Sequence, residues 1–312
     1  MADVLCFGNL QFDVLCRTVT HLPAVGSLAR VEHIDLSLSG NGGNVAAALS
    51  RLGISVDLAG YRGADLIGDA FAATLGDLAV GTTTLLRHPS VGSGTSVIAL
   101  APNGERTVLF TNGANALFEL DDVPDSWLEN RGLVSLSSVF VLPQFTGEAI
   151  GRLFARAQAA GAHTLLNTSW AVDGQNLDSL IPALTHTDTA VLSFDEGRQL
   201  TGLLTPMAVY DAVAERTAGQ VVLTLGADGC AFRELGAWRR LPSEPVDATD
   251  CTGAGDSFIA GYIAGTLRGL SLAGRARLGC LVASYAVTGP GSYPRIPALA
   301  ELERLHGGKF DG

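Results

Sequence analysis

Short apolar runs alternate along the chain with longer amphipathic stretches. The short runs are rich in Val, Ile and Leu, which is typical of buried strands. The longer stretches repeat apolar residues at positions i, i+3 and i+4, which indicates helices with one buried face. This alternation predicts an α/β fold built on a mostly parallel sheet. The predicted strands are Val4–Phe7, Val56–Ala59, Val139–Leu142, Thr164–Asn167, Thr189–Leu192 and Val221–Leu225, and the predicted helices are Asn44–Leu52, Leu66–Leu78, Glu148–Ala160, Met207–Ala218, Ala254–Arg268 and Leu272–Thr288.

Two segments interrupt this rhythm. Val14–Leu38 and Thr95–Phe110 alternate apolar and polar residues and contain turn residues, with no helical period. We expect them to form a small sheet at the edge of the large one where open α/β folds bind ligands, in the position of a lid. No repeat and no Pro/Ser-rich linker divides the chain, so we expect one domain.

The charge balance narrows the choice of partners. The chain has 20 basic and 31 acidic residues, for a net charge of -11. An acidic body repels phosphodiester backbones and anionic lipids, so we expect neither nucleic acid nor a membrane as partner. The only lysine is Lys309, and every other basic residue is arginine. This excludes a GxxxxGK[ST] phosphate loop and Schiff-base chemistry, so backbone amides or arginines must hold any phosphate.

The cysteines and the first residues bear on the compartment. Cys6, Cys16, Cys230, Cys251 and Cys280 are odd in number and scattered, without the spacing of a zinc site, which is typical of a reducing compartment. The opening MADVLCFGNL lacks the basic start and the unbroken apolar run of a signal peptide. We therefore expect a cytoplasmic protein.

The strongest chemical signal is Asp250–Asp256 (DCTGAGD), directly before an apolar helix. Small residues at a helix start leave backbone N–H groups unpaired and accessible, and the helix dipole there favours an anion such as phosphate. Asp256, in the first turn, is placed to take a proton from an incoming hydroxyl. The alternative is a structural turn in which Thr252 caps the helix and Asp256 complements its dipole.

Two further segments carry candidate binding residues. In Ser39–Asn44 (SGNGGN), glycines let a ligand approach the backbone, and Asn44 can cap the next helix or turn its amide toward a polyhydroxyl ligand. Asp13 follows the first strand, where it can accept sugar hydroxyls or serve as a turn residue. Thr224–Cys230 (TLGADGC) is either a plain hairpin or a loop that holds the phosphate tail of a nucleotide.

Taken together, these segments resemble the PfkB (ribokinase-like) family of carbohydrate kinases. Asp250–Asp256 is similar to the second family signature, with Cys251 where Thr is usual, and Ser39–Asn44 is similar to the first. The resemblance runs from end to end and implies a single domain over residues 1–312. It implies a ribokinase-like, doubly wound, mostly parallel sheet with helices on both faces, and a small β-sheet lid formed by about residues 14–38 and 95–110.

The resemblance also implies roles for individual residues. Asp256 matches the catalytic base, and Gly253, Ala254 and Gly255 match the anion hole. The acceptor-binding positions are Asp13, Gln11, Gly40, Asn44 and Gln144. The nucleotide-binding positions are Ser193, Glu196, Thr224, Gly226 and Gly229, of which Glu196 holds Mg²⁺ through water. Asp250, Ala286 and Gly291 match a K⁺ site of some relatives, or else simply surround a glycine-capped helix end.

Three positions depart from the family pattern, and the last two of them bear on the acceptor. Ser193 stands where an Asn is frequent, Gln144 stands near the place of an acidic residue, and Asn41 occupies a position that is lysine in several relatives. Without a lysine beside the first signature, a phosphorylated acceptor is disfavoured. Phe12, Tyr61 and Phe110 could stack a nucleoside base, although aromatic residues in such strands more often pack internally.

The sequence therefore predicts ATP-dependent, Mg²⁺-assisted transfer of the γ-phosphoryl group to a primary hydroxyl of a non-phosphorylated sugar or sugar-like acceptor. The alternatives are a nucleoside kinase of the same family and a non-catalytic sensor of sugar or nucleotide with a kinase fold. A nicotinamide oxidoreductase is excluded because no GxGxxG follows a strand. Apolar lid strands are prone to pair between subunits, which makes a homodimer through the lid an expectation.

Overall fold

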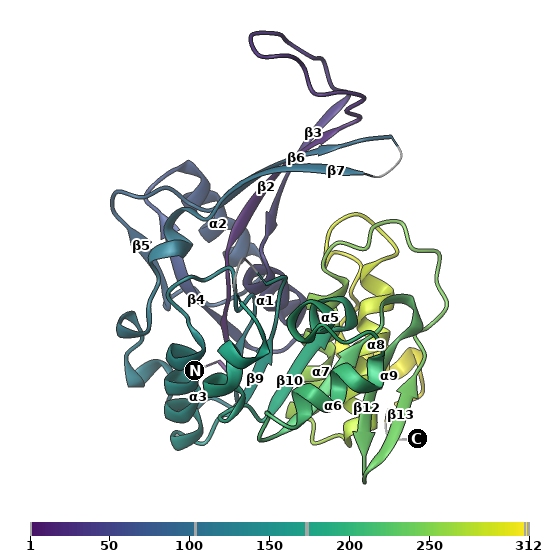
Figure 1. Ribbon diagram of the computed structural model, residues 1–312. Helices are drawn as coiled ribbons and strands as arrows, with labels where there is room; N and C mark the ends of the chain where they lie inside the picture. The colour runs from purple at the N-terminus through teal and green to yellow at the C-terminus, as the bar shows by residue number, and fades with distance from the viewer. Residues whose placement is uncertain (1, 103–104, 172–174, 309, 311–312) are drawn as a thin grey trace.

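The computed structural model describes residues 2–102, 105–171, 175–308 and 310, and a large sheet forms its centre (Figure 1). In this part of the chain seven neighbouring strands of the sheet run parallel to one another. Two further strands extend the sheet at one side, and each is antiparallel to the strand before it. Lys309 lies outside the described residues. In spatial order the strands are β13 (Ala237–Leu241), β12 (Cys230–Glu234), β11 (Gln220–Thr224), β10 (Thr189–Ser193), β9 (His163–Asn167), β8 (Leu133–Leu136), β1 (Val4–Phe7), β4 (Val56–Gly63) and β5 (Leu85–His88).

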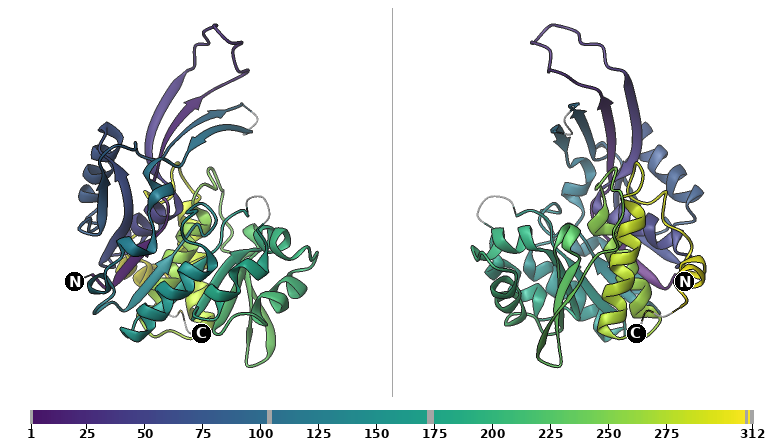
Figure 2. Two further views of the ribbon diagram at one scale, coloured as in Figure 1. Left: turned by 60° about the vertical axis from the view of Figure 1, so that its left-hand side comes forward. Right: turned by 90° about the vertical axis from the view of Figure 1, so that its right-hand side faces the viewer.

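Helices cover both faces of this sheet, as predicted. They are α1 (Asn41–Arg51), α2 (Leu66–Asp77), α3 (Gly147–Ala159), α4 (Ile181–Leu184), α5 (Phe194–Thr201), α6 (Pro206–Ala214), α7 (Ala254–Leu267), α8 (Leu272–Ala286) and α9 (Leu299–Leu305). Figures 1 and 2 show α3, α5 and α6 on one face and α7 and α8 on the other. Among the described residues, no helix combines the length and the apolar character needed to cross a bilayer.

Helix α7 is buried over most of its length, and this burial fixes where its first turn lies. Ser257 to Gly265 are all buried between α1 and α8. A Cβ on Gly261 would lie 2.6 Å from the carbonyl oxygen of Leu278, and one on Gly279 would lie 2.9 Å from Phe258. Glycine at these two positions therefore lets the backbones of α7 and α8 approach closely.

A second, four-stranded sheet stands away from the body, and it is the predicted lid (Figures 1 and 2). Its order is β3 (His33–Ser39), β2 (Gln11–Arg17), β6 (Thr95–Leu100) and β7 (Arg106–Thr111), with β2 and β6 parallel. Because β2 begins at Gln11, both Gln11 and Asp13 lie on a lid strand and not in a turn after β1.

The predicted strand Val139–Leu142 is wrong. The strand is β8, and it ends at Leu136. Ser138 has a φ of +66°, and Val141 donates its backbone N–H to the carbonyl of Ser138, so this segment is a turn. Val139 and Leu142 are buried all the same. A buried apolar turn gives the same hydrophobic pattern as a buried strand, which explains the error.

Helix α1 begins three residues before the predicted start, so Asn44 lies inside its first turn and is not its cap. The N-cap is Gly40, with a φ of +83°. A Cβ on Gly8 would lie 2.6 Å from the Cα of Gly42. The glycines of this segment therefore bring the first turn of α1 directly against the carboxyl end of β1.

Candidate active site

The Asp250–Asp256 loop places free backbone amides at the start of α7. Gly253 is the N-cap, with a φ of +73°, and a Cβ on it would lie 2.1 Å from the Cβ of Ser292. The N–H groups of Gly253 and Gly255 have no hydrogen-bond partner within the described residues, whereas that of Ala254 donates to the carbonyl of Cys251 at 3.3 Å. Two amides of the predicted anion hole are thus free, and the third is weakly engaged.

Asp256 lies beside these amides with its carboxylate held by neutral groups. Asn41 and Asn44 each donate an Nδ2–H to it, to Oδ1 and Oδ2 respectively, both at 2.8 Å. Burial raises the pKa of Asp256 to about 6, because the asparagine hydrogen bonds that favour the ionised form only partly offset burial, and the charge of Glu196 raises it further. A carboxylate that is nearly ready to bind a proton at neutral pH suits a general base.

A cavity of about 380 Å³ opens in front of Asp256. The body of the protein and the lid sheet both contribute to its walls, and its two ionisable side chains are both acidic. Phe110 and Val141 add apolar surface. The lining residues are Asn9, Gln11, Asp13, Ser39, Gly40, Asn41, Asn44, Ser96, Ile98, Phe110, Val141, Thr252, Gly253 and Asp256.

Comparison with known proteins decides the class of this site. The sequence model of the pfkB family carbohydrate kinases matches residues 1–299. The chain belongs to this family. Ribokinase of Mus musculus is 25% identical over 316 aligned residues, covering 96% of this chain and 94% of the relative. Fructoselysine 6-kinase of Shigella flexneri is 30% identical over 234 residues, covering 75% of this chain and 83% of the relative.

The fold of this kinase is also found among solved structures. Ribokinase of Arabidopsis thaliana, solved in complex with ribose and ATP, matches it with a TM-score of 0.85 at 22% identity, covering 97% of this chain and 98% of the other. The predicted family, ribokinase-like fold and carbohydrate-kinase class are therefore confirmed.

Several predicted residues of the kinase meet in or beside the cavity. Asp13, Gln11, Gly40, Asn44 and Asp256 all line it. Ser96 donates from Oγ to the Asp13 carboxylate. Gln144, by contrast, does not line the cavity: its side chain is exposed and donates to the carbonyl of Ala116 at 3.4 Å. The structure therefore gives Gln144 no contact with this cavity.

The predicted nucleotide-binding residues follow the carboxyl ends of β10 and β11. Ser193 is the N-cap of α5 and forms a capping box with Glu196, so its local role is structural. Glu196 Oε2 accepts from the Ser193 backbone and from the Thr168 hydroxyl, while burial raises the pKa of Glu196. Thr224 pairs in register with Ser193 at the same sheet edge.

The segment after Thr224 is a hairpin turn. Gly226 has a φ of +61°, and a Cβ on it would meet nothing within 4 Å, whereas Gly229 has a φ of +88°. A Cβ on Gly229 would lie 2.0 Å from the carbonyl oxygen of Leu241, so its glycine is needed for the turn itself. Gly226 has no such structural requirement for space, which leaves its surroundings open to a ligand.

The two ends of the predicted cation site lie together. Asp250 Oδ2 accepts from the backbone N–H of Gly291 at 3.3 Å, and Arg106 on β7 lies 3.5 Å from Asp250 Oδ1. Burial raises the pKa of Asp250, but hydrogen bonds from Thr252 and Gly291 and the charge of Arg106 outweigh it and lower the pKa overall. Ala286 is buried at the end of α8.

Sequence reasoning missed the residues that hold Asp256 and its loop. Asn41 was interpreted only as a missing lysine, and Asn9, Ser138 and Ser292 were not singled out, although they support the asparagines around Asp256. Arg106 donates to the Thr252 hydroxyl at 2.9 Å and so joins the lid to the Asp250–Asp256 loop. Their partners are remote in sequence, so no local pattern indicates them.

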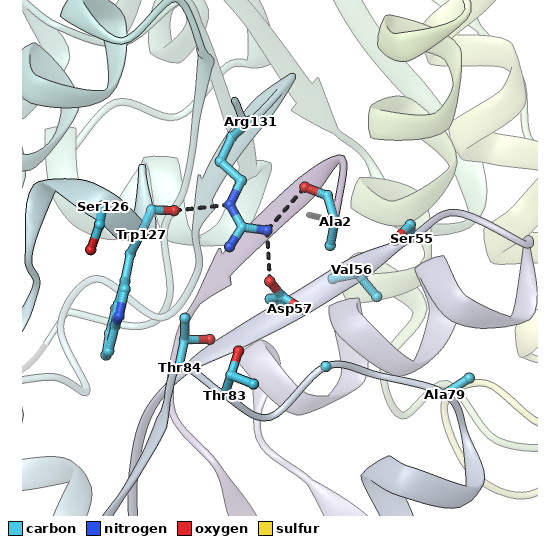
Figure 3. Close-up of a pocket in the computed structure, with 11 residues that line it drawn as sticks. Ala2, Ser55, Val56, Asp57, Ala79, Thr83, Thr84, Ser126, Trp127 and Arg131 are labelled. Atoms are coloured by element: carbon cyan, nitrogen blue, oxygen red, sulfur yellow. Dashed lines mark hydrogen bonds and ion pairs between the residues drawn. The ribbon is translucent and has the colours of Figure 1, made fainter. Parts of the chain in front are cut away.

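A larger cavity of about 570 Å³ lies at the opposite edge of the sheet, where β1, β4 and β8 begin (Figure 3). Arg131 is buried there and forms a 2.7 Å ion pair with Asp57. The same guanidinium donates to the carbonyls of Trp127 and Ala2, both at 2.9 Å. Because its charge is already matched, Arg131 joins three parts of the chain and does not form an anion site.

Proposed function

We propose that this kinase transfers the γ-phosphoryl group of ATP to a primary hydroxyl of a non-phosphorylated sugar or sugar-like acceptor. The observation that carries the proposal is the buried carboxylate of Asp256, which lies between the free amides at the start of α7 and a cavity lined by hydrogen-bonding groups. Base and anion hole thus share one helix terminus. Two relatives named as kinases, one solved with ribose and ATP, support the nucleotide and the acceptor class.

In the proposed reaction the acceptor hydroxyl gives its proton to Asp256. The hydroxyl oxygen bonds to the γ-phosphorus as the bond from that phosphorus to the ADP oxygen breaks. The N–H groups of Gly253 and Gly255 donate to the phosphoryl oxygens while negative charge accumulates on them. The lid sheet, joined to the loop by Arg106, keeps water from competing with the acceptor.

The cavity favours a neutral acceptor. Its ionisable lining residues, Asp13 and Asp256, are both acidic and would repel a sugar phosphate. Gln11 is buried, and its Oε1 has no hydrogen-bond partner in the described part of the chain, so a ligand hydroxyl would satisfy an otherwise orphaned acceptor. Asp13, Gly40 and Asn44 complete the proposed acceptor contacts.

A nucleoside acceptor fits this cavity less well. Of the three aromatic residues that could stack a base, Phe12 packs edge-on against Phe71 with ring centroids 5.7 Å apart. Tyr61 packs against Phe118 and donates its hydroxyl to Asp122 at 2.9 Å. Phe110 remains on the cavity wall, so one face of a base would have an aromatic partner and the other would not.

The residues present fit Mg²⁺ bound through water. Only Oε2 of Glu196 is hydrogen-bonded within the described residues, which leaves Oε1 to accept from a coordinated water. Bound there, the metal would neutralise charge on the nucleotide phosphates. Ser193, Thr224, Gly226 and Gly229 remain the proposed nucleotide contacts. No group of three or more His, Cys, Asp or Glu that could bind a metal directly occurs among the described residues.

A K⁺ ion at Asp250, Ala286 and Gly291 fits only after a change in the site. Both oxygens of the Asp250 carboxylate are engaged, Oδ1 by Thr252 and Arg106 and Oδ2 by Gly291. A cation at this carboxylate would have to displace the Arg106 guanidinium. Activation by K⁺ is therefore proposed only together with movement of the lid.

An ATP-consumption assay over pentoses, hexoses, their phosphates and nucleosides, each with and without KCl, tests the function. We expect turnover with a neutral sugar and weaker or no turnover with its phosphate. Binding of a sugar without turnover of any acceptor would instead favour the sensor.

Assembly and compartment complete the proposal. The lid strands carry exposed apolar side chains, which are Ile34, Leu36, Val97, Val108, Leu109 and Phe110. We propose that they pair between two subunits, to be tested by sedimentation of the full chain at several concentrations. All five cysteines are free thiols, which suits the reducing cytoplasm.

A further inference from the structure

Two hydrogen-bonded arms hold the Asp256 carboxylate, one through Asn44 and the other through Asn41, and each arm leads to a different serine. Asn44 donates to Oδ2 of Asp256, and its own Oδ1 accepts a 2.7 Å hydrogen bond from the hydroxyl of Ser292. Asn41 donates to Oδ1 of Asp256, and its own Oδ1 lies 2.7 Å from the hydroxyl oxygen of Ser138. The first arm is complete when Asp256 is ionised, because each donor in it has one acceptor.

The second arm is short of one proton in that state. Ser138 Oγ lies 2.7 Å from Oδ1 of Asn41 and 2.7 Å from Oδ1 of Asn9. Oδ1 of Asn9 also accepts the backbone N–H of Asn41 at 3.0 Å, which fixes the orientation of the Asn9 amide. A serine hydroxyl donates one hydrogen bond but can accept two. With Asp256 ionised, one of the two Ser138 contacts therefore has no proton.

Protonation of Asp256 removes this deficit if the Asn41 amide turns by half a rotation. Asp256 then donates to Oδ1 of Asn41, Nδ2 of Asn41 donates to Ser138 Oγ, and the Ser138 hydroxyl donates to Asn9. The two ends of an amide have nearly the same shape, so the turn needs no other movement. The same turn of Asn44 would leave the Ser292 hydroxyl without its acceptor.

The backbone keeps Ser138 in this place at some cost. Its φ of +66° is unusual for a residue with a side chain, and the residue is fully buried. It follows β8, whose neighbour β1 leads to Asn9, so two adjacent parallel strands deliver both residues to the first turn of α1. An arrangement that keeps a strained serine between two amides points to a use for its hydroxyl.

We infer that Ser138 is a positioning residue of the kinase site, which acts through Asn41 to accommodate a proton on Asp256, whereas Ser292 acts through Asn44 to keep Asp256 ionised. The inference rests on the proposed function for its role in catalysis. The proton taken from the acceptor hydroxyl stays on Asp256, and only the two hydrogen bonds of the Asn41 side chain, to Asp256 and to Ser138, reverse their direction. The chain thus lets the base exist in both forms that turnover requires.

The other charged groups near Asp256 would be unchanged in variants of Ser138 and Ser292. Asp13 on β2 lines the same cavity, and Glu196 on α5 acts on Asp256 through its charge. Asp250 and Arg106 lie at the rim, bound to Thr252. The facing residues of α1 are the two asparagines, which carry no charge. A difference between serine variants therefore reports the hydroxyl that was removed.

The test compares Ser138→Ala with Ser292→Ala in the full chain without ligands. Carboxyl ¹³C NMR of aspartate-labelled protein follows the titration of Asp256, which is assigned by its loss in Asp256→Asn. We expect Ser138→Ala to move the midpoint to lower pH by about 0.5–1 unit, the equivalent of one net hydrogen bond, and Ser292→Ala to move it to higher pH. Shifts in the same direction, or no shift in Ser138→Ala, would overturn the inference.

If the alanine variant does not fold, Ser138→Gly provides a second way to remove the hydroxyl, because glycine adopts a φ of +66° without strain. It should shift the midpoint as the alanine variant does, and a wild-type midpoint would overturn the inference. In the active enzyme, the acid limb of kcat/KM should move with the NMR midpoint. Opposite NMR shifts in an enzyme that phosphorylates no acceptor would overturn the proposed function and not the effect of Ser138 on Asp256.

Discussion

The two edges of the large sheet each hold a carboxylate beside a cavity, half-buried at one edge and buried at the other, and the groups that bind the carboxylate differ in charge. At the amino edge, Asp57 is paired with the guanidinium of Arg131, which also binds two backbone carbonyls (Figure 3). At the carboxyl edge, Asp256 is held by the neutral amides of Asn41 and Asn44. The amino-edge cavity is the larger of the two, at about 570 Å³ against 380 Å³.

The difference shows that the partners of a buried charge, and not cavity size, indicate where the chemistry is. A carboxylate matched by a buried guanidinium holds structure together. A buried carboxylate held only by amides keeps a raised pKa and can accept a proton. Of the two cavities described, only the one at the carboxyl edge lies beside the free N–H groups of Gly253 and Gly255.

Asp256→Asn should give the largest effect on activity. The amide cannot take the acceptor proton, so we expect kcat to fall by about 10²- to 10⁴-fold while sugar binding stays nearly intact. Steady-state kinetics and calorimetric titration of the sugar measure the two quantities. Asp57→Asn is the matched control at the other edge and should leave kcat of the folded protein unchanged. Full turnover in Asp256→Asn would exclude Asp256 as the base.

Arg131→Met should give the largest effect on stability. It leaves the half-buried Asp57 without its cation, which costs up to about 3–5 kcal/mol in the free energy of unfolding. The double variant Asp57→Asn with Arg131→Met should recover part of that loss, because no unpaired charge remains. Urea unfolding of the single and double variants measures this. If the single variant were as stable as the wild type, the contrast between the two edges would fail.

The effect of Asp256 on stability and its effect on activity should depend on pH in opposite directions. Its pKa is about 6 in the folded protein against an ordinary value of 3.8, so the folded state binds the proton more tightly. The stability that Asp256 contributes is therefore fully present below the ordinary value and is lost as pH rises through about 6, whereas kcat/KM should rise over the same range. Asp256→Asn should be more stable than the wild type at pH 8 by about 1–3 kcal/mol, with the difference vanishing toward pH 4. Thermal unfolding at both pH values tests this.

Contiguous sequence was enough to predict the parts of the site that depend on local backbone. The DCTGAGD segment contains the proposed base, the N-cap glycine and the free amides within seven residues, so its proposed chemistry follows from helix-terminus physics. The alternation in Thr95–Phe110 likewise gave the lid strands β6 and β7. Gln11 was assigned only by resemblance, and the structure gives it a physical reason, a buried Oε1 without a partner.

The parts that depend on tertiary convergence could not be predicted. Ser138 meets Asn9 and Asn41 only because β8 lies next to β1, and its segment was taken for a strand since buried turns and buried strands share one pattern. Cys230 and Cys280, interpreted as scattered, lie with their Sγ atoms 3.6 Å apart in the core. Pairings of this kind require the fold itself.

Arg106→Gln should have the smallest effect. It tests whether the carboxyl edge works without a cationic side chain, as the comparison of the two edges implies. Arg106 is about half exposed where it contacts Asp250 and Thr252, so its ion pair contributes little to stability. Its charge still lies beside the free amides, and its loss should raise the KM for ATP by roughly three- to tenfold, less at high salt. The acid limb of kcat/KM should not move, because Asp256 has no hydrogen bond to Arg106. A loss of kcat as large as that of Asp256→Asn would mean that a cation, and not amides alone, stabilises the transferring group.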